Sequence, residues 1–395
     1  MSLLEYIRAA ARAECKAESE YFEAEFRLLC SGTLYPDGID GDWTKSDGAR
    51  LLLVDPFQLI IASQPLNSFP QEIALRFKWC LETTIAGSTC SDSLQTKDIA
   101  GDIAALMTLL CRRLVTVGSE VRRRYYGLEQ ENPLHDFPFP LVNAERPAQW
   151  TPRPIEIHTS QNGHWVSAHD SQPVGFSRHS IRSILRHLPE LPSGKDVLRA
   201  AHRYSLAMEL IEREPEIAYQ LLVSAVETIA GSVLKDCSPS TEEQLKSKNN
   251  LLKAIEDTGV CEEDAQRIVL QDKSNSWSRW KFRKFLATFV AEDEIEANDD
   301  LFTAPLKYLP KKADFKGAIN DIYSKRSGAS HSGVPLPPSA TIGICPAIPN
   351  EVIETVTRGE KVFPPIVWFE RIVNTAIRNC LGRMIVPTNS SPSVE

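Results

Sequence analysis

One stretch of the chain constrains the fold more than any other, because it is apolar on nearly every side of a helix. Residues 218–230 read Ala-Tyr-Gln-Leu-Leu-Val-Ser-Ala-Val-Glu-Thr-Ile-Ala, and a helix of this kind is buried among other elements. Pro215 suits the first helical turn, where a missing N–H costs nothing. Glu227 needs a partner if it is buried; the alternative is a half-exposed position at the helix edge. The stretch predicts a helical bundle with this helix at its centre.

Amphipathic segments follow and precede this stretch, and they supply the surrounding helices. We expect these helices at 196–213, 241–257 (stopped by Gly259), 262–272, 277–290 and 365–381. The stretch 188–194, Leu-Pro-Glu-Leu-Pro-Ser-Gly, is typical of a domain boundary. The sequence therefore predicts a mainly α protein, with an α+β domain over 1–190, an all-α helical bundle over 195–386 and a disordered tail over 387–395.

The N-terminal domain is expected to mix helices with strands. A charged helix is predicted over 1–30, and 51–61 reads as two short buried strands around an Asp-Pro turn. Two more helices are predicted at about 70–84 and 98–117, the second capped by Thr96. Prolines crowd residues 132–154, which predicts an extended connector.

Three histidines flank a predicted β-hairpin turn at Asn162-Gly163. Pairing through that turn places His158 and His169 on one face and His164 on the other, so the three do not converge. Two histidines without an acidic partner make a poor metal site, and we expect no metal. The chain also lacks a phosphate-binding glycine loop, a Gly-x-Ser-x-Gly elbow and a His-Glu-x-x-His motif. We therefore expect no cofactor.

Composition indicates a cytoplasmic protein without a membrane anchor. The 395 residues carry a net charge of −8 and nine scattered cysteines, none in a Cys-x-x-Cys pair. Such cysteines are typical of reduced core residues. The N-terminus lacks a basic-then-apolar signal pattern, and no apolar run is long enough to span a bilayer.

The overall charge is acidic, but local charge is patterned. A segment without acids, 273–290, carries four candidate RNA-binding residues, and a second basic segment, 303–326, carries a fifth. A surface that is basic around one site suits a small anionic segment such as RNA. The alternative is a solvated helix face followed by the acidic run 291–300. The five candidates are Arg279, Lys281, Arg283, Lys284 and Lys325.

Aromatic side chains interleave with the first basic segment, and two interpretations of them stay open. Mixed aromatic and basic residues can stack nucleic-acid bases. The same spacing fits a plain hydrophobic stripe that faces the core of the bundle. The residues concerned are Trp277, Trp280, Phe282, Phe285 and Phe289.

The stretch 316–333 combines an amphipathic helix with a pair of residues suited to phosphodiester chemistry. Ser327-Gly328 and Ser332-Gly333 weaken the helix and offer a C-terminal cap. Arg326 is a permanent cation, and His331 titrates near neutral pH. Five positions apart, they lie about 140° apart on a regular helix, so they converge only if the last turn is distorted. Spacing alone is weak evidence, because it recurs at Arg153/His158 and Arg182/His187.

The context of the third pair is more specific. The pattern Tyr-x-x-Arg-Ser-x-x-x-His-x-Gly, at the end of a helix in a helical region, resembles the HEPN superfamily and its Apea-like branch over about residues 195–385. The resemblance implies a metal-independent endoribonuclease site, formed by Arg326 and His331 across a homodimer. It implies that Glu227 orients Arg326, with Tyr323 in support. Ser327 stands at the family's polar position after the arginine, where Asn or Asp is commoner.

The leading hypothesis is an endoribonuclease in which the RNA 2′-OH attacks the adjacent phosphate, leaving a 2′,3′-cyclic phosphate and a 5′-hydroxyl. The resemblance further implies a role in antiviral defence or stress, with the N-terminal domain sensing a signal or binding a protein partner. The alternative is a non-catalytic module that holds RNA or protein on a helical scaffold. Arg326 and His331 would then be structural, for example in capping the helix end.

Overall fold

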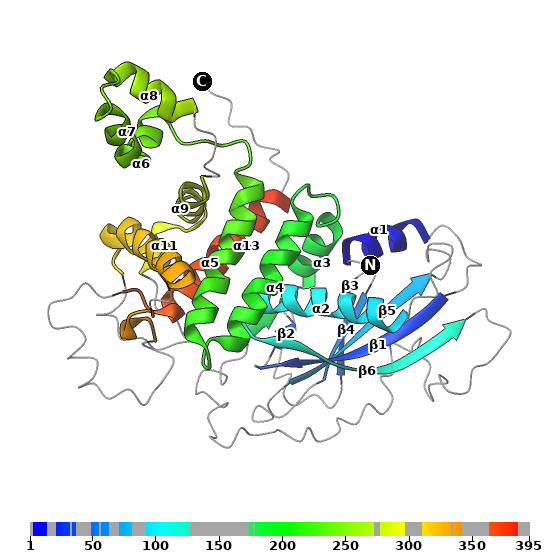
Figure 1. Ribbon diagram of the computed structural model, residues 1–395. Helices are drawn as coiled ribbons and strands as arrows, with labels where there is room; N and C mark the ends of the chain where they lie inside the picture. Colours follow the sequence, from blue (N-terminus) through cyan, green and yellow to red (C-terminus); the bar gives the residue numbers. More distant parts are fainter. Residues whose placement is uncertain are drawn as a thin grey trace, which may run out of the picture.

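The computed structural model contains a mainly helical chain with one five-stranded sheet (Figure 1). The sheet and two helices form one end of the molecule, and the remaining helices pack beside them. The structure describes residues 3–13, 21–31, 34–36, 49–54, 57–62, 71–80, 92–126, 174–176, 178–271, 277–296, 310–332, 335–341 and 363–385.

The five-stranded sheet is antiparallel, in the order β3-β4-β5-β1-β6. The buried apolar residues of β1 alternate, which is the period of a strand with one face toward the core: Ala24, Phe26, Leu28 and Cys30. Glu25, on the other face, is also buried and pairs with Arg76 of β5. Two short strands, β2 (Leu34–Pro36) and β7 (Val174–Phe176), pair in parallel. The strands of the large sheet are β3 (Ala49–Val54), β4 (Phe57–Ala62), β5 (Gln71–Cys80), β1 (Tyr21–Cys30) and β6 (Val115–Tyr126).

The predicted strand pair within 51–61 is confirmed as β3 and β4. The helix expected at 98–117 is confirmed with earlier bounds, Asp92–Cys111, but Thr96 lies inside it and does not cap it. Two other predictions in this region are wrong. The helix expected over 1–30 ends at Ala13, and Tyr21–Cys30 form strand β1; the helix expected at 70–84 is strand β5. Pairing with distant strands outweighs local helix propensity in these segments.

Helix α2 (Asp92–Cys111) lies between the sheet and the helical part of the molecule. It contacts β6 on one side and α4 on the other, and every residue from Ile103 to Leu109 is buried. Helix α1 (Leu3–Ala13) packs beside it. Because α2 is covered on both sides, one continuous hydrophobic core extends from the sheet into the helical bundle.

Helix α5 (Pro215–Val233) is the central helix that the sequence predicts, with Pro215 in its first turn. It packs against α4, α9, α11 and α13. The surrounding helices are α3 (Arg178–His187), α4 (Gly194–Leu210), α9 (Ser278–Phe289), α10 (Glu292–Ile295), α11 (Phe315–Ser332) and α13 (Ile366–Ile385), with 3₁₀ turns at Lys312–Asp314 and Pro338–Thr341.

Three short helices form a lobe that projects from the bundle (Figure 1). They are α6 (Thr241–Ser247), α7 (Asn249–Glu256) and α8 (Glu262–Gln271). The single helix expected at 241–257 is therefore two helices that meet at Lys248. Gly259 ends the pair with φ +87°, a conformation that glycine adopts without strain.

Helix α13 carries a buried polar cluster that joins the sheet end of the molecule to the bundle. Glu370 is fully buried, and Arg112 binds both of its oxygens, with Nη2–Oε2 at 2.5 Å and Nε–Oε1 at 3.2 Å. The Tyr204 hydroxyl donates to Oε1, and Asn374 Nδ2 donates to the Leu109 carbonyl at 2.6 Å. The expected domain boundary at 188–194, where the chain turns between α3 and α4, stays a prediction.

Several expectations fall outside the residues that the structure describes. They concern the connector 132–154, the hairpin with His158, His164 and His169, and the tail 387–395. Among the described helices, none is long and apolar enough to cross a membrane.

Candidate active site on helix α11

The motif residues lie on one continuous helix, α11. Phe315, Ala318, Ile319 and Ile322 form its buried face against α5 and α9. The helix runs through Ser327-Gly328 and ends at Ser332. The first of the two expected weak points is therefore helical, and the second coincides with the helix end.

Glu227 of α5 holds the motif arginine, as the resemblance implies. Arg326 Nη2 donates to Glu227 Oε2 at 3.1 Å, and the Tyr323 hydroxyl donates to Glu227 Oε1 at 2.9 Å. The pair is partly accessible, since the side chains of Arg326 and Glu227 are 29% and 19% exposed. We call these three residues the Glu227 cluster. Tyr323 and Arg326 both reach Glu227 because they lie three residues apart on α11, and residues three apart share a helix face.

Tyr323 is kept protonated by its surroundings. Burial raises its pKa to about 12, with the negative charge of Glu227 acting in the same direction. Arg326 and Arg279 lower the pKa of Tyr323, but by less. The hydroxyl is therefore a fixed donor to Glu227 and is not a general base at neutral pH. The Tyr323 ring packs on Phe282 of α9, with centroids 5.3 Å apart.

The second motif residue, His331, lies in the last turn of α11. The backbone there is α-helical, so the distortion that would bring Arg326 and His331 together is absent. Five residues apart on a regular helix, the two positions lie about 140° apart around the axis and about 7.5 Å apart along it. The side chains of His331 and Ser327 are outside the described part of the chain.

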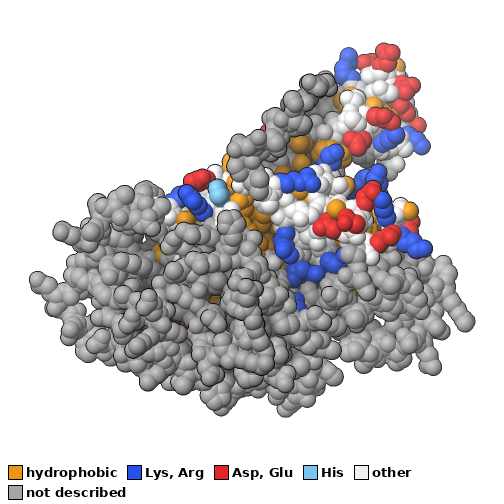
Figure 2. Space-filling view, turned by 180° about the vertical axis from the view of Figure 1, so that it is seen from behind, with side chains coloured by type: hydrophobic (Ala, Val, Ile, Leu, Met, Phe, Trp, Pro, Cys, Tyr) orange, Lys and Arg blue, Asp and Glu red, His pale blue; other side chains and the backbone are white. Residues whose placement is uncertain are grey.

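The predicted RNA-binding residues lie mostly on the surface next to this cluster. Arg279, Arg283, Lys284 and Lys325 are exposed, whereas Lys281 is partly buried. Arg279 Nη2 donates to Ser324 Oγ at 3.2 Å, which links α9 to α11 beside Tyr323. Figure 2 shows that acidic and basic side chains mix on the projecting lobe, so the described surface is not uniformly basic.

The aromatic residues of α9 divide between the two interpretations. Phe282, Phe285 and Phe289 are buried, which makes them a core stripe. Trp277 and Trp280, at the start of the helix, are partly exposed. Lys248 lies over the Trp277 ring, 5.3 Å from its centroid. Of the aromatic set, only these two tryptophans are therefore accessible to a ligand.

The other candidate positions contribute no second site among the described residues. His187 Nδ1 is 2.8 Å from the Ser183 carbonyl within α3, while Arg153, His158 and the Arg182 side chain lie outside the description. No described group of three or more His, Cys, Asp or Glu could hold a metal ion. Buried free cysteines fit the expected core role, but two others are exposed, Cys237 and Cys261.

Two features of the structure were not predicted from the sequence. One is the Glu370 cluster, whose members are far apart in the chain and give no local pattern. The other is Lys316, which lies across a pocket from the basic residues of α9. In the sequence, Lys316 belongs to the basic segment 303–326, and nothing there distinguishes it from the other basic residues of that segment.

Comparison with known proteins adds no family. No protein-family model, curated protein or solved structure matches the chain. The resemblance to the HEPN superfamily therefore stays a prediction from the sequence motif.

Proposed function

We propose that the protein is a metal-independent endoribonuclease of the HEPN type, acting in the cytoplasm in defence or stress. The observation that supports this most is the Glu227 cluster: a partly exposed arginine, oriented by a carboxylate, on the helix that also carries His331. A guanidinium held in this way is suited to phosphate oxygens, because its remaining N–H groups keep a fixed geometry.

The chemistry needs a proton carrier and a cation. The RNA 2′-OH loses its proton to a histidine and attacks the adjacent phosphorus, and the P–O5′ bond breaks. The leaving 5′ oxygen takes a proton, so the products are a 2′,3′-cyclic phosphate and a 5′-hydroxyl. His331 is the proton carrier in this proposal, since histidine titrates near neutral pH. Arg326 stabilises the negative charge that builds on the phosphoryl oxygens.

The regular geometry of α11 supports a site shared by two chains. One helix presents Arg326 and His331 on different sides, and one histidine cannot be both the base and the acid in a single step. A second copy of the chain, related by two-fold symmetry, supplies the missing group. We therefore include a homodimer in the proposal.

The first test is RNA cleavage by point variants. Arg326→Ala and His331→Ala should each lower the rate by about two orders of magnitude or more, the usual scale for a lost acid–base or charge-stabilising group. The double variant should cost far less than the product of the singles, because groups in one site act as a unit. His187→Ala is the matched control and should cleave normally. An inactive His187→Ala with an active His331→Ala would overturn the assignment.

The shared site has its own test. Wild-type chains, mixed with an excess of Arg326→Ala/His331→Ala chains and allowed to exchange subunits, should lose most of their activity, because a mixed dimer keeps only one of the two histidines. The activity of the wild-type chains should persist if each chain carries a complete site. Light scattering on the same samples checks the dimer, and a fully active monomer would contradict it.

A second candidate function is RNA or protein binding without catalysis. The observation that favours it is that Glu227 and Tyr323 also tie α5 to α11, a contact that a purely structural arginine would make. In that case, the wild type cleaves no RNA, Arg326→Ala lowers the melting temperature and His331→Ala leaves binding unchanged.

A further inference from the structure

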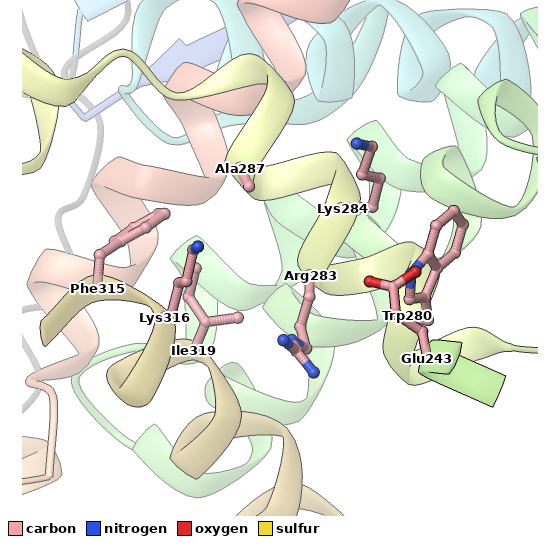
Figure 3. A pocket seen from close by; sticks show the side chains of 8 residues that line it. All are labelled: Glu243, Trp280, Arg283, Lys284, Ala287, Phe315, Lys316 and Ile319. Atoms are coloured by element: carbon pink, nitrogen blue, oxygen red, sulfur yellow. The ribbon is translucent and has the colours of Figure 1, made fainter. Parts of the chain in front are cut away.

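A pocket of about 230 Å³ opens between α6, α9 and α11 (Figure 3). On α11 it lies one helical turn from Tyr323 of the Glu227 cluster, since Ile319 in the pocket precedes Tyr323 by four residues and residues four apart share a helix face. On α9 it lies one turn from Arg279, which Arg283 in the pocket follows by four residues and which donates to Ser324 of α11.

Three cations and one acid line this pocket. Arg283, Lys284 and Lys316 all have exposed side chains. In the described part of the chain, no salt bridge engages Lys284 or Lys316. Figure 3 shows the Arg283 side chain between Lys316 and Ile319 on one side and Trp280 and Glu243 on the other. The lining thus carries an excess of positive charge that is available to a ligand.

The one acid, Glu243, already has partners within the protein. It belongs to the capping box of α6, where the Ser240 N–H donates to its Oε2 at 3.0 Å. That hydrogen bond lowers the pKa of Glu243, and the Trp280 side chain acts in the same direction. Trp280 lines the pocket beside Glu243 and is partly exposed, so its ring is accessible to a ligand.

The remaining lining is apolar, with Phe315 and Ile319 of α11 both buried beneath it. The pocket therefore combines a positive rim, a partly exposed indole and an apolar floor. A phosphate fits the rim, because Arg and Lys donate charge-assisted hydrogen bonds to its oxygens. A flat aromatic base fits the indole, because base–aromatic stacking tolerates any base.

We propose that this pocket binds one nucleotide unit, with its phosphate between Arg283 and Lys316 and its base against Trp280. Lys284 points to the other side of α9 from Arg283 (Figure 3) and adds positive charge along the path of the strand. The inference rests on the proposed function and deepens it: the unit is a nucleotide of the RNA strand near the bond to be cleaved. A free mononucleotide has the same chemistry, and the test separates the two sources.

The test uses a fully 2′-O-methylated oligonucleotide, which lacks the attacking hydroxyl and cannot be cleaved. Its affinity is measured by fluorescence anisotropy over a salt series. Each of Arg283→Gln, Lys284→Gln and Lys316→Gln should reduce the slope of log K against log salt by about 0.7. Trp280→Ala should weaken binding roughly ten-fold with little change of slope, and Trp280→Phe should retain much of the affinity.

Lys253→Gln, an exposed lysine of α7 outside the pocket, is the matched control and should bind like the wild type. Unchanged affinity and slope in Lys316→Gln and Trp280→Ala, with folding intact by circular dichroism, would overturn the proposal. Competition with a 5′-mononucleotide assigns the source. Displacement of the oligonucleotide indicates a free nucleotide as the occupant, and failure to displace it indicates the RNA strand.

A failure of the pocket inference can be distinguished from a failure of the proposed function. If the pocket inference is wrong, the wild type still cleaves RNA and the pocket variants keep its KM. If the endoribonuclease proposal is wrong, the wild type binds the methylated oligonucleotide in the pocket and cleaves no RNA.

Discussion

The same three residue types occur twice in this molecule, in two different settings. In the Glu370 cluster, Arg112 and Tyr204 bind a carboxylate that is fully buried between α2, α4 and α13. In the Glu227 cluster, Arg326 and Tyr323 also bind a carboxylate, but near the surface and with one oxygen each. The arginine side chain is 15% exposed in the first and 29% exposed in the second.

The difference in burial assigns different roles to the two clusters. In the Glu370 cluster both carboxylate oxygens bind Arg112, and Oε1 also accepts from Tyr204. It therefore holds the sheet end against the bundle. In the Glu227 cluster, one guanidinium nitrogen of Arg326 binds the carboxylate, and the group is accessible. The buried cluster is a structural clamp, and we interpret the surface cluster as a clamp that presents a cation.

The largest effect is expected from Glu370→Gln, which removes the charge of the buried cluster. Arg112 would then be left in the core without this carboxylate, and breaking a buried ion pair costs about 3–5 kcal/mol. The free energy of unfolding, measured by urea denaturation, should fall by that amount. A loss below about 1 kcal/mol would show that the two clusters do not differ in the way proposed.

A smaller effect on stability and a specific effect on activity are expected from Glu227→Gln. Stability should fall by less than about 1 kcal/mol, because a partly exposed ion pair contributes little. The value of kcat should fall about ten-fold or more, because Arg326 loses the group that orients it, while KM stays near the wild type. An unchanged kcat with a large loss of stability would make this cluster a structural clamp like the first.

The smallest effects are expected from the tyrosines. Tyr323→Phe should lower the free energy of unfolding by about 0.5 kcal/mol and leave kcat near the wild type. Tyr204→Phe should lower it by about 1 kcal/mol, because it removes a donor from a buried carboxylate. Tyr323 has a folded pKa of about 12 against an ordinary 10.0. The stability that it contributes is present below pH 10 and is lost as the pH rises toward 12. A pH titration followed by tyrosinate absorbance should therefore show one tyrosine with a raised pKa fewer in Tyr323→Phe than in the wild type.

The central helix and the candidate site were within reach of the sequence, whereas the sheet was only partly so. Residues 218–230 could be placed because a helix that is apolar on nearly every side must be buried, whereas the partner of Glu227 came from the resemblance to the HEPN superfamily and not from the residues alone. The strands at 21–30 and 71–80 could not be predicted from the sequence, because each pairs with residues far away in the chain. The Glu370 cluster was hidden for the same reason: Arg112, Tyr204 and Glu370 meet only in the folded chain.

The most direct test of the central claim is cleavage of an end-labelled RNA by the purified protein at neutral pH in excess chelator, with the product ends identified. The account predicts cleavage without metal, fragments that end in a 2′,3′-cyclic phosphate, and a loss of about a hundred-fold or more in Arg326→Ala. Intact RNA in the chelator, or cleavage that Arg326→Ala carries out as fast as the wild type, would contradict it.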